Sequence, residues 1–176
     1  MRKLKNNELE RISIEEFKNV EKTPITIILD NVRSAFNVGS IFRTSDAFLI
    51  NKIILCGITA TPPNKEIRKA ALGASESVKW EYRENTLDAI KQLHKEGQHV
   101  IAIEQTVKAI PLNVFNPPEK PLAIVFGHEV NGISQKVIHK CDEVIEIPQF
   151  GTKHSLNISV ATGIIIWRLW EKMNTH

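Results

Sequence analysis

Short apolar runs recur along the chain and are separated by polar stretches. Six of these runs have the length and the β-branched content of buried strands, at 25–29, 53–56, 78–82, 99–103, 122–126 and 144–147. Most of them are continuous rather than alternating, which is typical of parallel strands that are covered on both faces. The pattern therefore predicts a sheet inside the molecule rather than one exposed to solvent.

Segments with helical spacing lie between these runs. The one between Asn85 and Gly97 is the clearest, because Asn85 is a good N-cap and Leu87, Ile90 and Leu93 form one apolar stripe. Further helices are predicted over 37–48, 65–72, 134–140 and 156–173. Since strands and helices alternate, the fold class is α/β, with a mostly parallel sheet and helices on both faces.

The last predicted helix carries four consecutive apolar residues, from Ile164 to Trp167. A helix that covers one face of a sheet needs only a single apolar stripe, so an apolar circumference indicates burial on two sides. Either the helix lies deep in its own core, or a second copy of the chain covers its outer side. We expect a homodimer.

The length of 176 residues predicts one domain, and the 42% apolar and 24% charged content is ordinary for a globular protein. We expect the catalytic domain to span 24–176, preceded by an N-terminal basic extension at 1–23 with Arg2, Lys3, Lys5 and Arg11. That basic group is explained equally by a solvated terminus and by contact with RNA. The net charge of +3 permits an anionic partner without requiring one.

Several classes of protein lack their signals here. There is no apolar stretch long enough to span a membrane, and the histidines show no metal-ligand spacing, so neither a membrane nor a metal is expected. No dinucleotide-binding glycine motif, P-loop or nucleophile elbow is present. Cys56 and Cys141 lie far apart, and Cys56 ends an apolar run, so a reducing cytoplasm is expected.

Three polar segments follow predicted strands, where open α/β sheets bind their ligands. In the first, Gly39 permits close backbone approach, and Arg43 is expected near the start of a helix, where anions are favoured. The planar guanidinium suits a phosphate. The alternative is a structural ion pair of Arg43 with Asp46 or Asp30.

The second segment contains Gly127, which leaves room for a flat ligand, and Glu129, which can accept hydrogen bonds or pair with an arginine. His128 between them is either a general base or an ordinary surface histidine. In the third segment, Ser155 is either the N-cap of the last helix or a site residue. Asn157 is expected in the first turn of that helix, from which its amide can reach the site. Together the segments predict one composite site.

In order and spacing, these segments resemble the three motifs of the SpoU/TrmH family of SPOUT RNA methyltransferases. The matching stretches are 37–47, 125–134 and 147–159, and the resemblance extends over about 24–173. It implies methylation of a ribose 2′-hydroxyl of tRNA or rRNA, with S-adenosylmethionine held in a C-terminal trefoil knot. The knot is implied by the resemblance alone, because threaded chains are nearly absent among folds. The cofactor-binding positions carried over by motif are Ile103, Gly127, Ile147 and Leu156.

The resemblance also implies a catalytic set of Arg43, Asn37, Glu129, Ser155 and Asn157. The family's mechanism makes the arginine the base, but a guanidinium does not lose its proton in a protein. We therefore expect Arg43 to clamp an RNA phosphate and orient the hydroxyl, while the other residues hold Arg43 and the ribose. Two alternatives stay open: a non-catalytic RNA-binding relative, and a small-molecule enzyme with an anionic substrate at the Gly39 turn. The sequence does not identify the RNA, the nucleotide or any accessory protein.

Overall fold

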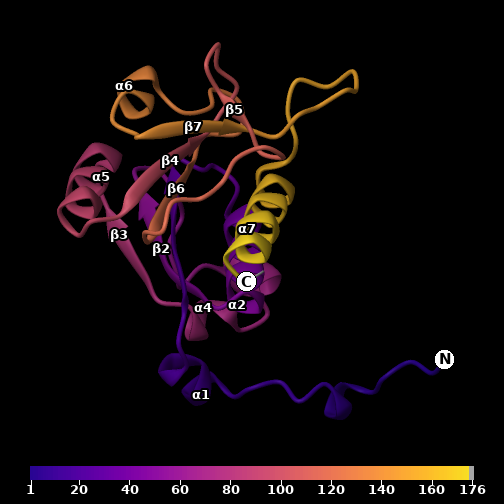
Figure 1. Ribbon diagram of the computed structural model, residues 1–176. Helices are drawn as coiled ribbons and strands as arrows, with labels where there is room; N and C mark the ends of the chain where they lie inside the picture. The colour runs from indigo at the N-terminus through magenta and orange to yellow at the C-terminus, as the bar shows by residue number, and fades with distance from the viewer. Residues whose placement is uncertain (175–176) are drawn as a thin grey trace.

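The computed structural model describes residues 1–174, apart from the side chain of Asn6, and contains a seven-stranded sheet in the order β3-β2-β1-β6-β4-β7-β5 (Figure 1). Every neighbouring pair of strands is parallel, which confirms the predicted sheet. The carboxyl ends of all the strands therefore lie along one edge. The strands are β1 (Thr23–Asp30), β2 (Ile50–Cys56), β3 (Trp80–Arg83), β4 (His99–Ile103), β5 (Ile110–Pro111), β6 (Leu122–Phe126) and β7 (Glu143–Glu146).

Helices cover both faces of the sheet, as the apolar runs predict. On one face, α5 (Thr86–Lys95) and α6 (Gln135–Ile138) pack over a core that includes Ile90 and Val137. A second core lies on the other face and includes Phe17, Ile67 and Ile165. The helices that cover it are α1 (Ile14–Asn19), α2 (Ala35–Ala47), α3 (Lys65–Ala71), α4 (Ala74–Ser77) and α7 (Ile158–Asn174).

Helix α2 begins earlier than predicted, because Ser34 is its N-cap and accepts a hydrogen bond from the Asn37 N–H at 3.2 Å. Gly39 therefore lies at the start of the second turn and Arg43 at the start of the third. The expectation that Arg43 projects near the helix N-terminus is wrong. Gly39 instead serves helix packing, since a Cβ there would lie 2.5 Å from the Ile67 carbonyl oxygen of α3.

Helix α7 begins later than predicted. Asn157 lies just before it and accepts hydrogen bonds from the Ser159 N–H at 2.9 Å and from the Ser159 hydroxyl at 2.7 Å. Ser155 is therefore not the N-cap, and Asn157 is not in the first turn. Of the four consecutive apolar residues, Ile165 and Ile166 are fully buried, whereas Ile164 and Trp167 are 38% and 51% exposed.

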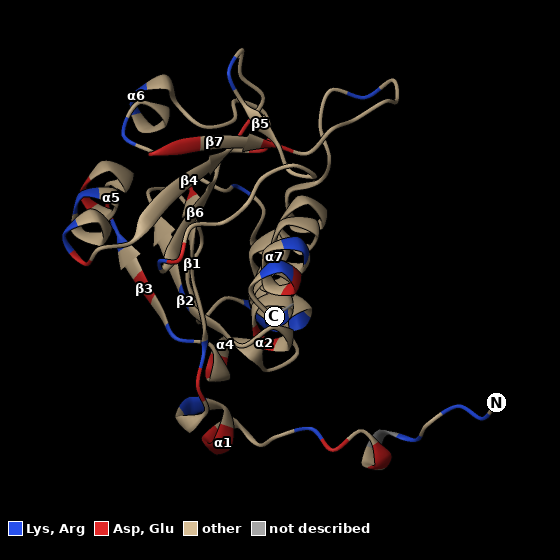
Figure 2. Ribbon diagram, viewed as in Figure 1, with Lys and Arg blue, Asp and Glu red and all other residues tan. Residues whose placement is uncertain are grey.

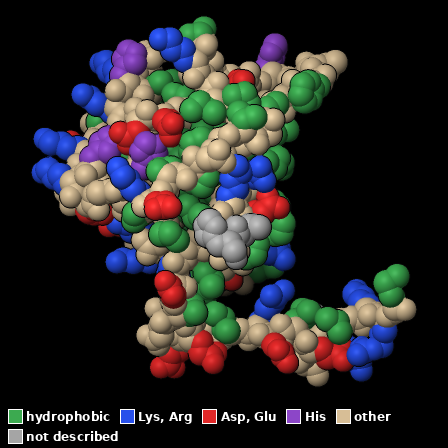
Figure 3. Space-filling view, viewed as in Figure 1, with side chains coloured by type: hydrophobic (Ala, Val, Ile, Leu, Met, Phe, Trp, Pro, Cys, Tyr) green, Lys and Arg blue, Asp and Glu red, His purple; other side chains and the backbone are tan. Residues whose placement is uncertain are grey.

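The N-terminal residues 1–13 extend away from the rest of the molecule (Figures 1 and 3). The chain is anchored after this arm by Phe17 of α1, which is only 3% exposed. Within the arm, the Arg2 guanidinium pairs with the Glu8 carboxylate at 2.8 Å, so part of the predicted basic group is neutralised locally. A 3-10 turn (Asn6–Glu8) is the only regular structure before α1 in this described stretch.

Cys56 is completely buried among apolar side chains, as predicted. Burial raises the pKa of its thiol to about 11, so the thiol stays protonated and acts as a small hydrophobic group. Among residues 1–174, no helix combines the length and the apolar character that crossing a bilayer requires.

Candidate active site

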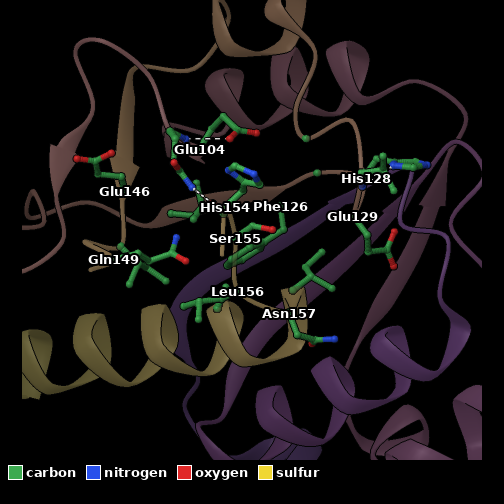
Figure 4. Close-up of a pocket in the computed structure, with 18 residues that line it drawn as sticks. Glu104, Phe126, His128, Glu129, Glu146, Gln149, His154, Ser155, Leu156 and Asn157 are labelled. Atoms are coloured by element: carbon green, nitrogen blue, oxygen red, sulfur yellow. Dashed lines mark hydrogen bonds between the residues drawn. The ribbon is translucent and has the colours of Figure 1, made fainter. Parts of the chain in front are cut away.

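A cavity of about 540 Å³ opens at the carboxyl edge of the sheet, beside the ends of β4, β6 and β7 (Figure 4). Three separate stretches of chain line it: 103–105, 126–132 and 146–158. All four residues that were predicted to bind the cofactor are among the lining residues, namely Ile103, Gly127, Ile147 and Leu156. The tertiary structure thus brings these positions together, while their roles remain predictions.

Glu129 connects the three polar segments. Its carboxylate oxygens accept hydrogen bonds from the backbone N–H of Arg33 at 2.9 Å and of Ser34 at 3.0 Å, and from the Asn37 side-chain amide at 3.3 Å. Asn37 in turn accepts from the Asn157 side-chain amide at 3.3 Å. A continuous network therefore runs from the loop after β6, through the start of α2, to the start of α7.

This network explains the charge of Glu129. Burial alone would raise the pKa of its carboxyl, but hydrogen bonds from Arg33, Ser34 and Asn37 hold the pKa below its ordinary value. The anionic carboxylate lies at the N-terminus of α2, which favours negative charge. Glu129 therefore already places a negative charge at the helix start where an external anion was expected.

Arg43 lies outside the cavity, exposed on α2. Within residues 1–174 its guanidinium makes no ion pair or hydrogen bond, so the predicted alternative of a structural pair with Asp46 or Asp30 is wrong. Asp46 accepts instead from the Ser77 hydroxyl, and Asp30 from the Thr86 hydroxyl. The charge of Arg43 is thus left available to a partner outside its own chain.

His128 organises the loop that carries Glu129. Its Nδ1 atom accepts hydrogen bonds from the Val130 N–H at 3.0 Å and the Asn131 N–H at 3.2 Å. Two donors facing Nδ1 require the proton of the neutral ring to be on Nε2. His128 therefore shapes the loop rather than acting as a base through Nδ1. The sequence left open a general base or an ordinary surface histidine, and this structural role is neither.

Gly127 is required by the same loop. A Cβ there would lie 2.5 Å from the carbonyl carbon of Gly132 and 2.6 Å from the Ile133 nitrogen. The missing side chain at Gly127, predicted to leave room for a flat ligand, is thus also required by the loop's own backbone. Ser155 and Asn157 also line the cavity, and Asn157 lies at the same end of it as Glu129 (Figure 4).

Several residues of the site were not predicted from the sequence. Glu104 and Gln105 line it directly after β4, and Ser34 caps the helix that carries Asn37. A signal for the first two was available, since they are polar residues that follow a buried strand, like the other segments. Ser34 precedes Asn37 by three residues, which is N-cap spacing.

A parallel sheet covered on both faces, with a composite cavity at its carboxyl edge, defines an α/β ligand-binding protein. The chain belongs to the SpoU rRNA Methylase family, whose model matches residues 24–167. Membership of this family implies the trefoil knot around the cavity and agrees with the resemblance read from the three motifs.

Known relatives support this assignment. The chain is 30% identical over 151 residues to the putative TrmH family tRNA/rRNA methyltransferase YacO of Bacillus subtilis, covering 86% of this chain and 60% of that protein. It is 29% identical over 149 residues to the 23S rRNA (guanosine-2'-O-)-methyltransferase RlmB of Neisseria meningitidis, covering 85% and 59%. The chain thus spans about 60% of the length of these curated relatives.

A solved structure has the same fold. The AdoMet-bound rRNA methyltransferase from Sinorhizobium meliloti superposes with a TM-score of 0.80 at 26% identity, covering 91% of this chain and 61% of that one.

Proposed function

We propose that this protein is an RNA methyltransferase that uses S-adenosylmethionine to methylate a ribose 2′-hydroxyl of tRNA or rRNA. The observation that carries the proposal is the Glu129–Asn37–Asn157 network beside the carboxyl-edge cavity. The names of the relatives support it, since RlmB is described as a guanosine-2'-O-methyltransferase and the Sinorhizobium structure as AdoMet-bound.

The lining of the cavity suits this cofactor. Apolar side chains such as Ile103 and Leu156 can cover an adenine ring. None of the described residues that line the cavity is Lys or Arg. Bound there, S-adenosylmethionine supplies an electrophilic methyl group on a positively charged sulfur.

The chain's own contribution is positioning. A ribose hydroxyl is a weak nucleophile at neutral pH, so its alignment with the methyl group must supply much of the rate, up to about 7–11 kcal/mol in the best model reactions. The Glu129 network links the side-chain amides of Asn37 and Asn157, of which Asn157 lines the cavity. These amides, with the Ser155 hydroxyl, orient the ribose.

Arg43 has a different part. Because its guanidinium is exposed and has no partner within the described chain, it can bind an RNA phosphate with two hydrogen bonds. It remains protonated throughout and fixes the position of the nucleotide. The proton of the hydroxyl then leaves late, to the phosphate or to water.

A homodimer belongs to the same proposal. Exposed apolar residues lie on α7, at Val160, Ile164 and Trp167, and on the neighbouring helix α2 at Phe36. Arg43 follows Phe36 by seven residues and so shares its face of α2. Association through this surface would bring Arg43 to the interface. There it could bind the phosphate of an RNA whose ribose lies in the cavity of the partner.

The assembly can be tested by one charge substitution. Trp167→Glu should convert the dimer to a monomer in sedimentation equilibrium and abolish methyl transfer. The matched control is Val107→Glu, because Val107 is fully exposed on the turn between β4 and β5. A wild-type monomer that is fully active would refute the dimer.

The reaction itself is tested with total RNA from a deletion strain and S-adenosylmethionine carrying a labelled methyl group. Label on one ribose, followed by mapping of the nucleotide, is the expected result and identifies the substrate. RNA binding without transfer would favour the alternative, a non-catalytic RNA-binding relative. Lys and Arg lie on the arm and on α5, α6 and α7 in Figure 2.

Arg43→Lys separates the two roles of the arginine. If the planar guanidinium with its two parallel donors is required, the rate of methyl transfer falls by about 100-fold, the scale of one lost transition-state contact. Binding of S-adenosylmethionine should be unchanged, because Arg43 does not line its own cavity. Near-normal turnover of the lysine variant would contradict the requirement for a planar guanidinium.

The two unpaired cysteines are compatible with a cytoplasmic location, which we include in the proposal.

A further inference from the structure

We propose that Glu104 and Gln105 act as a clasp that holds the two cofactor-binding loops, 127–133 and 148–157, in place around the cavity. This inference rests on the proposed use of S-adenosylmethionine. Neither residue belongs to the three motifs from which the site was predicted. Both are positioning residues, because they act through the loops that they hold.

Glu104 fastens the first loop. Its Oε2 atom accepts a hydrogen bond from the Ile133 N–H at 2.9 Å, and its Oε1 atom accepts from the Gln105 N–H at 2.8 Å. The fit is close, since a Cβ at Gly132 would lie 2.2 Å from Oε2. The carboxylate is thereby fixed at both oxygens and in turn fixes the end of the loop.

The loop that Glu104 holds is itself a closed unit. The His128 N–H donates to the Gly132 carbonyl at 3.2 Å, and the Gly132 N–H donates back to the His128 carbonyl at 2.8 Å. This unit carries Gly127 and Glu129. If the end of the loop at Ile133 shifts, both the cavity wall and the Glu129 carboxylate at the start of α2 are displaced. The Glu104 bond thus sets the position of the whole unit.

Gln105 fastens the second loop. Its side-chain amide donates to the His154 carbonyl oxygen at 2.6 Å. Within the described chain, this is the only hydrogen bond that joins residues 148–156 to another segment. The loop is otherwise exposed, and Phe150 near its tip is 97% exposed. A single amide therefore determines where this wall of the cavity lies.

The order of the strands makes such a clasp possible. β4 lies between β6 and β7 in the sheet, and the two loops leave the carboxyl ends of these two neighbours. β4 is the only strand between them in the sheet. The residues that follow β4 therefore lie between the two loops, and Glu104 bonds to one loop and Gln105 to the other.

Glu104 could alternatively matter only through its negative charge, and substitutions separate the two roles. Glu104→Ala removes the acceptor for Ile133, whereas Glu104→Gln removes the charge and keeps one carbonyl acceptor. Glu146→Gln removes the charge of a second glutamate that lines the same cavity and whose side chain makes no hydrogen bond among the described residues. If Glu104 acts as a clasp, the affinity for S-adenosylmethionine should fall only in variants that lose the hydrogen bond to the Ile133 N–H.

The experiment is calorimetric titration of the full chain with S-adenosylmethionine, with RNA affinity and kcat at saturating cofactor as parallel readouts. Glu104→Ala and Gln105→Ala should each raise the Kd about tenfold, which corresponds to roughly 1.4 kcal/mol. Gln105→Ala should leave kcat and RNA affinity near the wild-type values, whereas Glu104→Ala should also lower kcat, because it displaces the loop that carries Glu129. Glu104→Gln should restore most of the affinity. The matched control is Glu119→Ala, at an exposed position that precedes β6 at the opposite edge.

Hydrogen exchange of the ligand-free protein tests the clasp without the cofactor. Glu104→Ala should speed exchange in 127–133, and Gln105→Ala should speed it in 148–156, with the sheet unaffected. Unchanged exchange and unchanged Kd would overturn the clasp, as would equal losses of affinity in Glu104→Gln and Glu146→Gln. A wild-type protein that does not bind S-adenosylmethionine would refute the proposed function, while selective exchange would still support the clasp.

Discussion

Two carboxylates at opposite edges of the sheet are held in much the same way. Glu129, at the carboxyl edge, accepts from the backbone of Arg33 and Ser34. Asp142, just before β7 at the amino edge, accepts from the Val100 N–H at 2.7 Å and from His94 at 3.0 Å. Burial would raise the pKa of each carboxyl, and the hydrogen bonds lower it below its ordinary value.

The two carboxylates differ in what lies beyond them. Asp142 contacts His94 and His99, which secure α5 to the start of β4. Glu129 lines the cavity and continues through Asn37 to Asn157. A perturbed carboxyl pKa therefore indicates a well-bonded side chain at either edge. The cavity and the network of side-chain amides that continues from the carboxylate are what identify the functional one.

The largest expected effect comes from matched isosteric substitutions of the two acids. In Glu129→Gln, an N–H₂ group replaces one accepting oxygen and faces a backbone N–H, so the network to Asn37 is broken. We expect kcat/KM for methyl transfer to fall about 100-fold, the scale of a lost transition-state contact. Asp142→Asn should remain within a few fold of wild type. Equal losses of activity in the two variants would remove the distinction between the edges.

The cavity edge should also be intolerant of one added methyl group. Gly127→Ala would place a Cβ 2.5 Å from Gly132, so the loop must move. We expect the Kd for S-adenosylmethionine to rise at least tenfold, or about 1.4 kcal/mol. Gly163→Ala in α7 is the control for cofactor binding, because a Cβ there meets nothing within 4 Å. Normal binding by Gly127→Ala would show that the loop is less rigid than its packing indicates.

At the amino edge the expected effect is on stability. Asp142→Asn weakens the bonds to Val100 and His94, and it should lower the free energy of unfolding by about 1 kcal/mol. This is below the usual range for a hydrogen bond to a charged group, because the Asp142 side chain is 38% exposed and therefore screened. Urea unfolding measures the change. An unchanged midpoint with impaired methyl transfer would reverse the roles assigned to the two edges.

The smallest expected effect is the dependence of the free energy of unfolding on pH. Both folded-state pKa values are lower than the ordinary values of 4.5 and 3.8, so each carboxylate stabilises the protein above its unfolded-state pKa. That stability is lost as the pH falls through the folded-state pKa. Urea midpoints should therefore decline below about pH 4.5. Glu129→Gln and Asp142→Asn should each flatten the decline, and a rise in stability on acidification would contradict the sign.

Local pattern predicted most of the secondary structure. The runs at 99–103 and 122–126 coincide with β4 and β6, and Asn85 caps α5 as expected, with its side chain accepting from the Leu87 N–H. Strand β5 was missed because it has only two residues, one of them a proline. The starts of α2 and α7 were predicted at 37 and 156, which is wrong. The side chains of Ser34 and Asn157 accept the hydrogen bonds from the first backbone N–H groups of these helices.

The sequence alone determined the class of fold, the parallel sheet and the three polar segments, because apolar periodicity and strand-end chemistry are local properties of the chain. The tertiary structure decided which groups meet. The Glu129 carboxylate occupies the start of α2, and Arg43 is left exposed outside the cavity. The order β6-β4-β7 brings Glu104 and Gln105 between two loops. Strand order depends on packing between distant segments, and local periodicity carries no record of it.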